Sequence, residues 1–301
     1  MNTDLNRQAL NAVDQCRWRD AQELLYKYVR KTPCHKSYHN LGYYLLINGR
    51  ISPNGAYRNA DKVAVRYLTK AAEYDTTAAN RIALAMAVDI LQEKHSGVCD
   101  PTAYRTAFLA MQEAHEIEPS YESMYNKIRY LYLSEPQNDT ILNELRSLVD
   151  VFPCYESIWF FCWLLMERGL ADECLQYMDM YQSVLSEDDM DRMILYYKCG
   201  AYEKCSALYE PLHDKWVFRV SDAAFMVDSL IKTGDVEAAY ECVQNCISFY
   251  SECPNSQIKS KCKCFKDMLS DDVTLSTKNR LKLIEKYSVK PQIIHQNCFL
   301  L

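Results

Sequence analysis

Three cysteines near the C-terminal end form the densest cluster of metal-binding side chains. Cys262 and Cys264 are separated by one residue, and Cys253 precedes them. Thiolates are strong ligands for Zn²⁺, but structural zinc sites typically contain paired cysteines separated by two residues. We therefore interpret this segment as an ordinary helical surface and expect no metal site in it.

Two histidines near the N-terminal end give a second candidate cluster. His35 and His39 are four residues apart, a spacing that places both on one face of a helix, and Cys34 is adjacent. No nearby acidic residue completes a set of ligands. We therefore expect exposed helix histidines at both positions rather than a metal site.

The sequence lacks the motifs of the common enzyme classes. It contains no Gly-rich phosphate-binding loop, no HExxH, no GxSxG and no paired CxxC motifs. These motifs would supply a phosphate cradle, a zinc-dependent hydrolase site, a serine nucleophile and a thiol-based metal site. We therefore expect a protein without enzymatic activity and without a cofactor.

The last four residues, Cys298 to Leu301, match a prenylation signal whose terminal leucine favours the geranylgeranyl lipid. Basic residues upstream would add attraction to an anionic membrane. Signals of four residues also arise by chance in a chain with 14 cysteines. We therefore expect no membrane attachment unless Cys298 is lipidated.

Composition places the chain among folded, helical proteins. Of its 301 residues, 49% are hydrophobic and 25% are charged, which is typical of a globular protein with a sizeable core. Only 7 glycines and 9 prolines are present, too few for the many turns of an all-β protein. The formal net charge of −6 argues against nucleic acid as a partner, because phosphate binding requires clustered cations. The expected class is all-α.

No targeting or membrane-spanning segment is evident. The start, MNTDLNRQAL, lacks the basic and apolar regions of a secretory signal. The longest apolar run, Ile158 to Met166, is much shorter than the roughly 20 residues that cross a bilayer. The scattered cysteines are then best interpreted as reduced thiols in a helical core. We expect a cytoplasmic protein.

One short phrase occurs twice and sets a period for the chain. Pro119-Ser-Tyr-Glu-Ser123 and Pro153-Cys-Tyr-Glu-Ser157 begin 34 residues apart, which is typical of stacked two-helix hairpins. Glycine favours the left-handed conformation that ends many helices. Amphipathic stretches are separated by glycines, and we expect hairpin turns at Gly49, Gly169, Gly200 and Gly234.

A first-helix pattern accompanies this period. It is clearest at Tyr38, Leu41, Gly42 and Leu45. Prolines stand at the expected ends of second helices, at Pro33, Pro119 and Pro153. With these features the chain resembles the tetratricopeptide-repeat family, with divergent repeats, over about residues 2 to 250. The resemblance implies a right-handed α-solenoid of about seven helix-turn-helix repeats whose concave groove binds a peptide or a partner protein.

The prolines and glycines also predict where the repeats begin and end. A solenoid over residues 1–250 would be followed by capping helices at 251–290 and a mobile tail at 291–301, because a polar terminal pair closes the last exposed face of a solenoid. The predicted units lie near 2–33, 34–75, 76–119, 120–153, 154–186, 187–217 and 220–250.

The repeated phrase provides a register for the side chains of the first helices. Residues four apart share a helix face, so aligned positions form columns on the expected groove. One column contains His39, Tyr125 and Trp159, and the other contains Tyr43, Arg129 and Trp163. Trp, Tyr and Arg are the types that most often anchor protein partners. The candidate binding residues are therefore Lys36, His39, Tyr43, Tyr125, Arg129, Trp159 and Trp163.

Two alternatives remain at this point. A shift of one residue would turn Trp159 and Trp163 toward neighbouring hairpins as core residues. A clamp for a partner's C-terminal carboxylate, known in one subgroup of the family, is disfavoured because the first two units offer Asn6, Leu10, His39 and Tyr43 in place of its lysine and asparagine pair.

The sequence thus predicts a non-enzymatic scaffold or adaptor for a protein or peptide. A peptide-sensing regulator that acts by sequestration is an alternative, and so is an accessory subunit that presents a peptide substrate to a modifying enzyme. The identity of the partner and the oligomeric state are not encoded in any pattern that we recognise.

Overall fold

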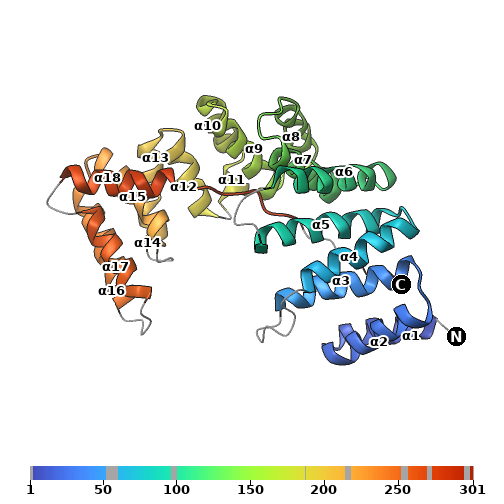
Figure 1. Cartoon of the computed structure of the whole chain (residues 1–301). Helices are drawn as coiled ribbons and strands as arrows, with labels where there is room; N and C mark the ends of the chain where they lie inside the picture. The colour runs from blue at the N-terminus through green and yellow to red at the C-terminus, as the bar shows by residue number, and fades with distance from the viewer. Residues whose placement is uncertain are drawn as a thin grey trace. The chain divides into compact units, whose positions relative to one another are not determined.

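The computed structural model describes residues 3–51, 60–95, 100–186, 188–213, 218–251, 257–269, 273–294 and 299–300. Within these ranges every regular element is a helix, so the predicted all-α class is confirmed (Figure 1). None of the helices in these ranges is long and apolar enough to cross a bilayer. The residues form two compact units: unit 1 contains Met1–Leu148 together with Gln292–Leu301, and unit 2 contains Val149–Pro291.

Unit 1 is a stack of helical hairpins followed by the C-terminal tail. From α1 to α7 each helix packs against the next in the chain, and the first helices α3 and α5 also contact each other. This is the packing of an α-solenoid. The helices are α1 (Thr3–Asp14), α2 (Trp18–Lys31), α3 (His35–Ile51), α4 (Ala60–Tyr74), α5 (Ala78–His95), α6 (Pro101–Ile117), α7 (Tyr121–Ser134) and α8 (Thr140–Val151).

Unit 2 repeats the same plan of packed helical hairpins. Its first helices α9, α12 and α15 contact one another in succession, and α15 also packs against α17 and α18. The helices are α9 (Tyr155–Glu167), α10 (Ala171–Met180), α11 (Gln182–Leu185), α12 (Asp189–Lys198), α13 (Tyr202–Ser206), α14 (Tyr209–His213), α15 (Val220–Lys232), α16 (Val236–Ser251), α17 (Gln257–Met268) and α18 (Val273–Glu285). The division into seven units and a cap stays a prediction.

Three of the four predicted glycine turns adopt the expected conformation. Gly169, Gly200 and Gly234 have φ angles of 74°, 78° and 89°. Residues that have a side chain rarely adopt this backbone conformation. The turn predicted at Gly49 is wrong, because α3 continues through this residue to Ile51. One glycine inside a helix costs only about 1 kcal/mol relative to alanine, and the preceding turns of α3 outweigh that cost.

Close packing of small residues joins the two helices of a hairpin. One face of α4, formed by Ala64, Leu68 and Ala71, is fully buried. A Cβ atom added to Gly42 on α3 would lie 2.8 Å from Leu68 Cγ and 3.2 Å from the Ala64 carbonyl oxygen. The absence of a side chain at Gly42 therefore lets α3 and α4 approach closely.

A buried carboxylate holds three helices of unit 2 together. Asp228 on α15 accepts hydrogen bonds from Tyr197 on α12 at 2.6 Å and from Arg280 on α18 at 3.0 Å, and Lys232 Nζ lies 3.0 Å from it. Burial acts to raise the pKa of Asp228, but these hydrogen bonds outweigh burial and lower the pKa below its ordinary value. The charged form of Asp228 therefore stabilises the folded unit.

This network predicts a stability that falls in acid. Because the folded-state pKa of Asp228 is depressed, its contribution is fully present above its ordinary pKa of about 3.9 and is lost as the pH falls through the folded-state value. Urea unfolding of the wild type and of Asp228→Asn, followed by circular dichroism from pH 7 to pH 2.5, tests this. The difference in stability between the two proteins should shrink below pH 4, and a constant difference would contradict the assignment.

Candidate functional site: an asparagine surface that holds the C-terminal tail

Three first helices have a buried serine as their third residue, and it fixes their first turn. Ser37, Ser123 and Ser157 each accept a hydrogen bond from the backbone N–H of the residue three positions earlier, at 3.0, 3.0 and 3.3 Å. Such capping satisfies a helix N–H that lacks an intrahelical partner. The serine therefore explains the repeated phrase, and it sets α3 and α7 in the same register, with Asn40 and Asn126 three residues after it.

Asn126 on α7 binds the backbone of the C-terminal tail through both atoms of its amide. Its Nδ2 donates to the Ile294 carbonyl oxygen at 2.8 Å, and its Oδ1 accepts from the Ile294 N–H at 3.0 Å. The side chain of Asn126 is fully buried, and Ile294 is half-buried. One amide thus pairs with both hydrogen-bonding groups of a single residue, 168 positions away in the sequence.

Asn40 on α3 binds Leu300 in the same way. Its Oδ1 accepts from the Leu300 N–H at 2.8 Å and its Nδ2 donates to the Leu300 carbonyl oxygen at 2.7 Å. Asn6 on α1 adds a second donor to that carbonyl at 3.0 Å, and its Oδ1 accepts from Asn40 Nδ2 at 2.8 Å. Both lone pairs of the Leu300 carbonyl and both protons of the Asn40 amide are therefore in use.

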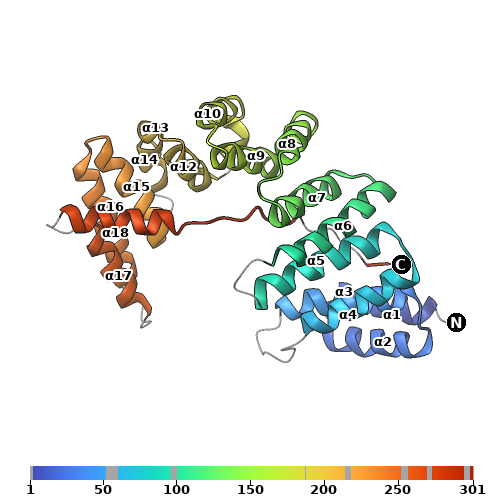
Figure 2. The same ribbon diagram turned by 45° about the horizontal axis from the view of Figure 1, so that its top comes forward.

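We call Asn6, Asn40 and Asn126 the asparagine surface. Ile294 and Leu300 are separated by six residues, an even number, so an extended chain presents the backbone groups of both to the same edge. Six extended residues span at most about 20 Å, close to the distance across two steps between first helices packed about 10 Å apart. The described ends of this segment lie at different first helices, Ile294 at α7 and Leu300 at α3 and α1. Figures 1 and 2 show the C-terminus beside the helices of unit 1.

An aromatic contact accompanies the backbone bonds at the end of the tail. The ring of Phe299 meets the ring of Tyr43 on α3 edge to face, with centroids 4.8 Å apart and planes at 78°. Aromatic pairs of this geometry contribute about 0.5–1.5 kcal/mol beyond the area that they bury. Tyr43, a predicted binding residue, therefore contacts the segment that the asparagine surface holds.

His39 on α3 forms a polar contact with α5 inside unit 1. Its Nδ1 lies 2.7 Å from Asn80 Oδ1 on α5, while the Asn80 amide nitrogen donates to the carbonyl of Asp75 at 2.8 Å. Because the amide oxygen only accepts, Nδ1 of His39 carries the proton. His39 is fully buried, so the prediction of an exposed histidine is wrong here: its polar atom pairs inside the unit. Lys36, one turn earlier on α3, is half-buried.

The metal-binding candidates are not brought into a complete site. His35 lies 3.6 Å from Asp75, an acidic neighbour that sequence spacing did not reveal. In the part of the chain that the structure describes, no three His, Cys, Asp or Glu side chains are placed to hold one metal ion. Cys253 and the lipidation candidate Cys298 both lie outside the described residues.

Tyr125 and Arg129, the other candidates in unit 1, lie on α7 and are buried. Arg129 forms an ion pair with Asp89 on α5, with Nη1 3.1 Å from Oδ2 and Nη2 3.4 Å from Oδ1. Burial alone would lower the pKa of Arg129, but the Asp89 carboxylate outweighs it and raises the pKa. Arg129 thus joins two first helices, a structural contact that its place in the column did not reveal.

Trp159 and Trp163 lie on α9, in unit 2. Their rings stack with centroids 5.7 Å apart, and 6% and 4% of their surfaces are exposed. Within the described residues, the indole Nε1 of Trp163 is buried without a hydrogen-bond acceptor. Their role in binding stays a prediction.

Sequence reasoning missed the asparagines by one residue. Asn40 directly follows His39, and Asn126 directly follows Tyr125, so both belong to the next column of the same alignment. Asn6 precedes Asn40 by 34 residues, the period of the repeated phrase. The available signals were therefore the 34-residue spacing of Asn6 and Asn40 and the shared position of Asn40 and Asn126 three residues after a capping serine. The choice of large aromatic and cationic side chains passed over both.

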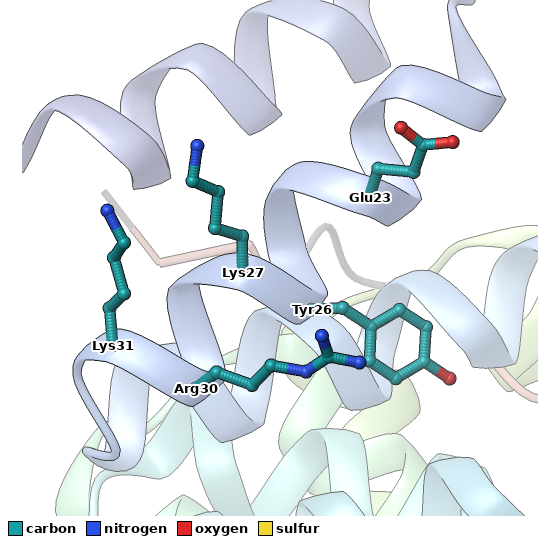
Figure 3. Close-up of a pocket in the computed structure, with 5 residues that line it drawn as sticks. All are labelled: Glu23, Tyr26, Lys27, Arg30 and Lys31. Atoms are coloured by element: carbon teal, nitrogen blue, oxygen red, sulfur yellow. The ribbon is translucent and has the colours of Figure 1, made fainter.

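A shallow pocket on α2 is a weaker candidate. Figure 3 shows its lining residues, which all come from this one helix: Glu23, Tyr26, Lys27, Arg30 and Lys31. Four of these five side chains are exposed, so the pocket offers a solvated charged surface rather than an enclosed site. The asparagine surface is the better defined binding feature of the described chain.

Comparisons with known proteins define the class to which this arrangement belongs. The structure is similar to a solved tetratricopeptide-repeat protein from Parabacteroides merdae, with a TM-score of 0.59, 16% sequence identity, and coverage of 87% of this chain and 97% of that one. No family model and no curated protein matches the sequence. The chain is a helical-repeat protein. Its fold is that of tetratricopeptide-repeat proteins, which confirms the resemblance inferred from the sequence.

Proposed function

We propose that this protein is a non-enzymatic scaffold that binds an extended segment of a partner protein or peptide in the groove formed by the first helices of unit 1. One observation carries the proposal: the amides of Asn126 and Asn40 each bind both backbone groups of one tail residue. Such pairing is complementary to any extended peptide that has an N–H at that position. It is not suited to a nucleic acid or to a small metabolite.

The strength of these contacts is sufficient for a specific interaction. A hydrogen bond contributes about 0.5–1.5 kcal/mol net, whereas a buried amide left without its partner costs about 1–3 kcal/mol. Five hydrogen bonds join the tail to Asn6, Asn40 and Asn126. Backbone recognition fixes the register of the segment, and side-chain contacts such as Tyr43 with Phe299 then discriminate between sequences.

The candidate residues fall into different roles under this proposal. Tyr43 and Tyr125 would contact the partner, whereas His39 and Arg129 hold the first helices in place through Asn80 and Asp89. Lys36 would provide a charged contact at the rim. Trp159 and Trp163 would anchor a partner on unit 2, and unfolding of the protein on their replacement by alanine would identify them as core residues instead.

A binding assay with modified peptides tests backbone recognition directly. In the full-length protein, Ile294→Pro with Leu300→Pro removes both N–H donors and frees the asparagine surface. A fluorescent peptide with the sequence of residues 291–301 and serine for Cys298 should then bind with 1:1 stoichiometry by anisotropy. An N-methyl group at Ile294 should weaken binding about 10-fold or more, because it deletes the hydrogen bond to Asn126.

Matched controls separate this outcome from general effects. An N-methyl group at Ile293 should change affinity little. In an extended chain the N–H groups of adjacent residues point to opposite edges, so the N–H of Ile293 points away from Asn126 when that of Ile294 points toward it. In the protein, Asn126→Ala should reduce binding, whereas Asn143→Ala, an exposed position on α8, should not. Retention of full affinity by Asn126→Ala would refute the proposed site.

A further inference from the structure

The tail that occupies the asparagine surface belongs to the chain itself, so the site is already filled. We propose that residues 292–301 act as an intramolecular competitor, and that the partner is an uncharged, extended segment with the same six-residue spacing, which must displace the tail to bind. This inference rests on the proposed function and adds the class of ligand and the regulation of the site.

The spacing of the two anchors defines the ligand. Asn126 pairs with the backbone of Ile294, and Asn40 with Asn6 pairs with the backbone of Leu300, which directly follows the aromatic Phe299. The two anchored residues present the same backbone edge because they are separated by an even number of residues. A partner segment therefore needs free backbone N–H and C=O groups at two positions six apart, with an aromatic residue directly before the second.

The tail is poor in charged side chains. The sequence from Gln292 to Leu301 contains no Asp, Glu, Lys or Arg. The contacts that join Ile294 and Leu300 to the asparagines are amide hydrogen bonds, and Phe299 adds a contact between two aromatic rings. Interactions of this kind are only weakly screened by salt, unlike those between exposed charges. Binding of the partner segment should therefore change little between 50 mM and 500 mM salt.

The covalent connection makes the tail an effective competitor. A tethered ligand has a local concentration on the order of millimolar, so a free peptide with the same contacts must exceed that concentration or bind more tightly. The apparent affinity of the intact protein for a free segment is then reduced by the fraction of molecules whose surface is open. A partner with better side-chain contacts, or one presented at high local concentration, displaces the tail.

Competition in the full-length protein tests the inference. The labelled peptide of residues 291–301 is titrated into the wild type and into the Ile294→Pro, Leu300→Pro variant. The wild type should bind at least about 10-fold more weakly. In the wild type, the amide protons of Ile294 and Leu300 should be protected from hydrogen exchange, and excess peptide should abolish that protection.

The possible outcomes distinguish this inference from the proposed function. Equal, tight binding to both proteins would overturn tail competition while leaving the scaffold function intact. Failure of the peptide to bind either protein would refute the proposed function itself. A wild type that sediments as a dimer and becomes a monomer in the proline variant would show that the tail binds a second copy, which also overturns the intramolecular inference.

A second pair of peptides tests the spacing. Insertion of one glycine after Gln296 of the peptide makes the separation of the two anchors odd, so one of them turns its backbone groups away from the asparagines. Replacement of Gln296 by glycine keeps the separation and serves as the matched control. The insertion should weaken binding to the proline variant at least about 10-fold more than the replacement does, and equal affinities would exclude a fixed register.

Discussion

Replacement of Arg129 with methionine should lower the free energy of unfolding of unit 1 by about 3–5 kcal/mol, because it leaves the Asp89 carboxylate without its cation. Only 2% of the Arg129 side chain and none of the Asp89 side chain is exposed, so water cannot take the place of the lost partner. Urea denaturation, with amide exchange in α5 and α7 as the local readout, measures the loss. Removal of one member of a buried pair is among the most destabilising single changes available in this unit.

Two controls make this result specific. Arg105→Met breaks the Arg105–Glu135 pair, which is 2.6 Å long but has both side chains close to half exposed, so it should cost less than about 1 kcal/mol. Asp89→Leu combined with Arg129→Met should recover most of the stability, since a buried ion pair and an apolar pair are often of similar net value. If Arg129→Met reduced peptide binding without reducing stability, Arg129 would instead be a direct partner contact.

The architecture could be predicted from the sequence because the start and the end of each helix depend on residues close to them in the chain. The serine that follows each proline caps the next first helix, and Gly169, Gly200 and Gly234 provide the left-handed residue after a helix. Gly49 shows the limit of such rules. A glycine favours a helix end only where the chain must turn, and at Gly49 the helix continues.

The asparagine surface was predicted less well, because the tail that it holds is distant from it in the sequence. The columns included Tyr43, whose ring contacts Phe299 of the tail, but they did not include the asparagines that bind its backbone. An amide that pairs with a backbone group has no distinctive composition, and the tail itself has no helical period. Its docking depends on pairings such as Asn40 with Leu300, 260 residues apart, which no local pattern records. The described residues Ile294 and Leu300 of this tail are half-buried and held by hydrogen bonds.

Exchange of Asn126 for aspartate should detach the tail from α7 at neutral pH. The two side chains have the same shape, but a carboxylate cannot donate, so one of its oxygens would face the Ile294 carbonyl oxygen, which now lies 2.8 Å from the amide nitrogen. Loss of that hydrogen bond and the repulsion between the two oxygens together cost about 3 kcal/mol. The amide proton of Ile294, whose protection depends on docking, should therefore exchange about 100-fold faster than in the wild type, whereas Asn143→Asp should have no effect.

The same variant should recover in acid, which separates a lost donor from a damaged fold. A protonated carboxyl group has an O–H that donates to the Ile294 carbonyl and an oxygen that accepts its N–H, so it reproduces the amide. Docking favours this neutral form and raises the pKa of the new carboxyl above its ordinary value of about 3.9. Tail docking in Asn126→Asp should therefore strengthen as the pH falls from 7 toward 4, measured by protection of Ile294 after correction for intrinsic exchange. A tail that stays detached across this range would mean that the amide is needed for the packing of α7, and not for pairing with a peptide backbone.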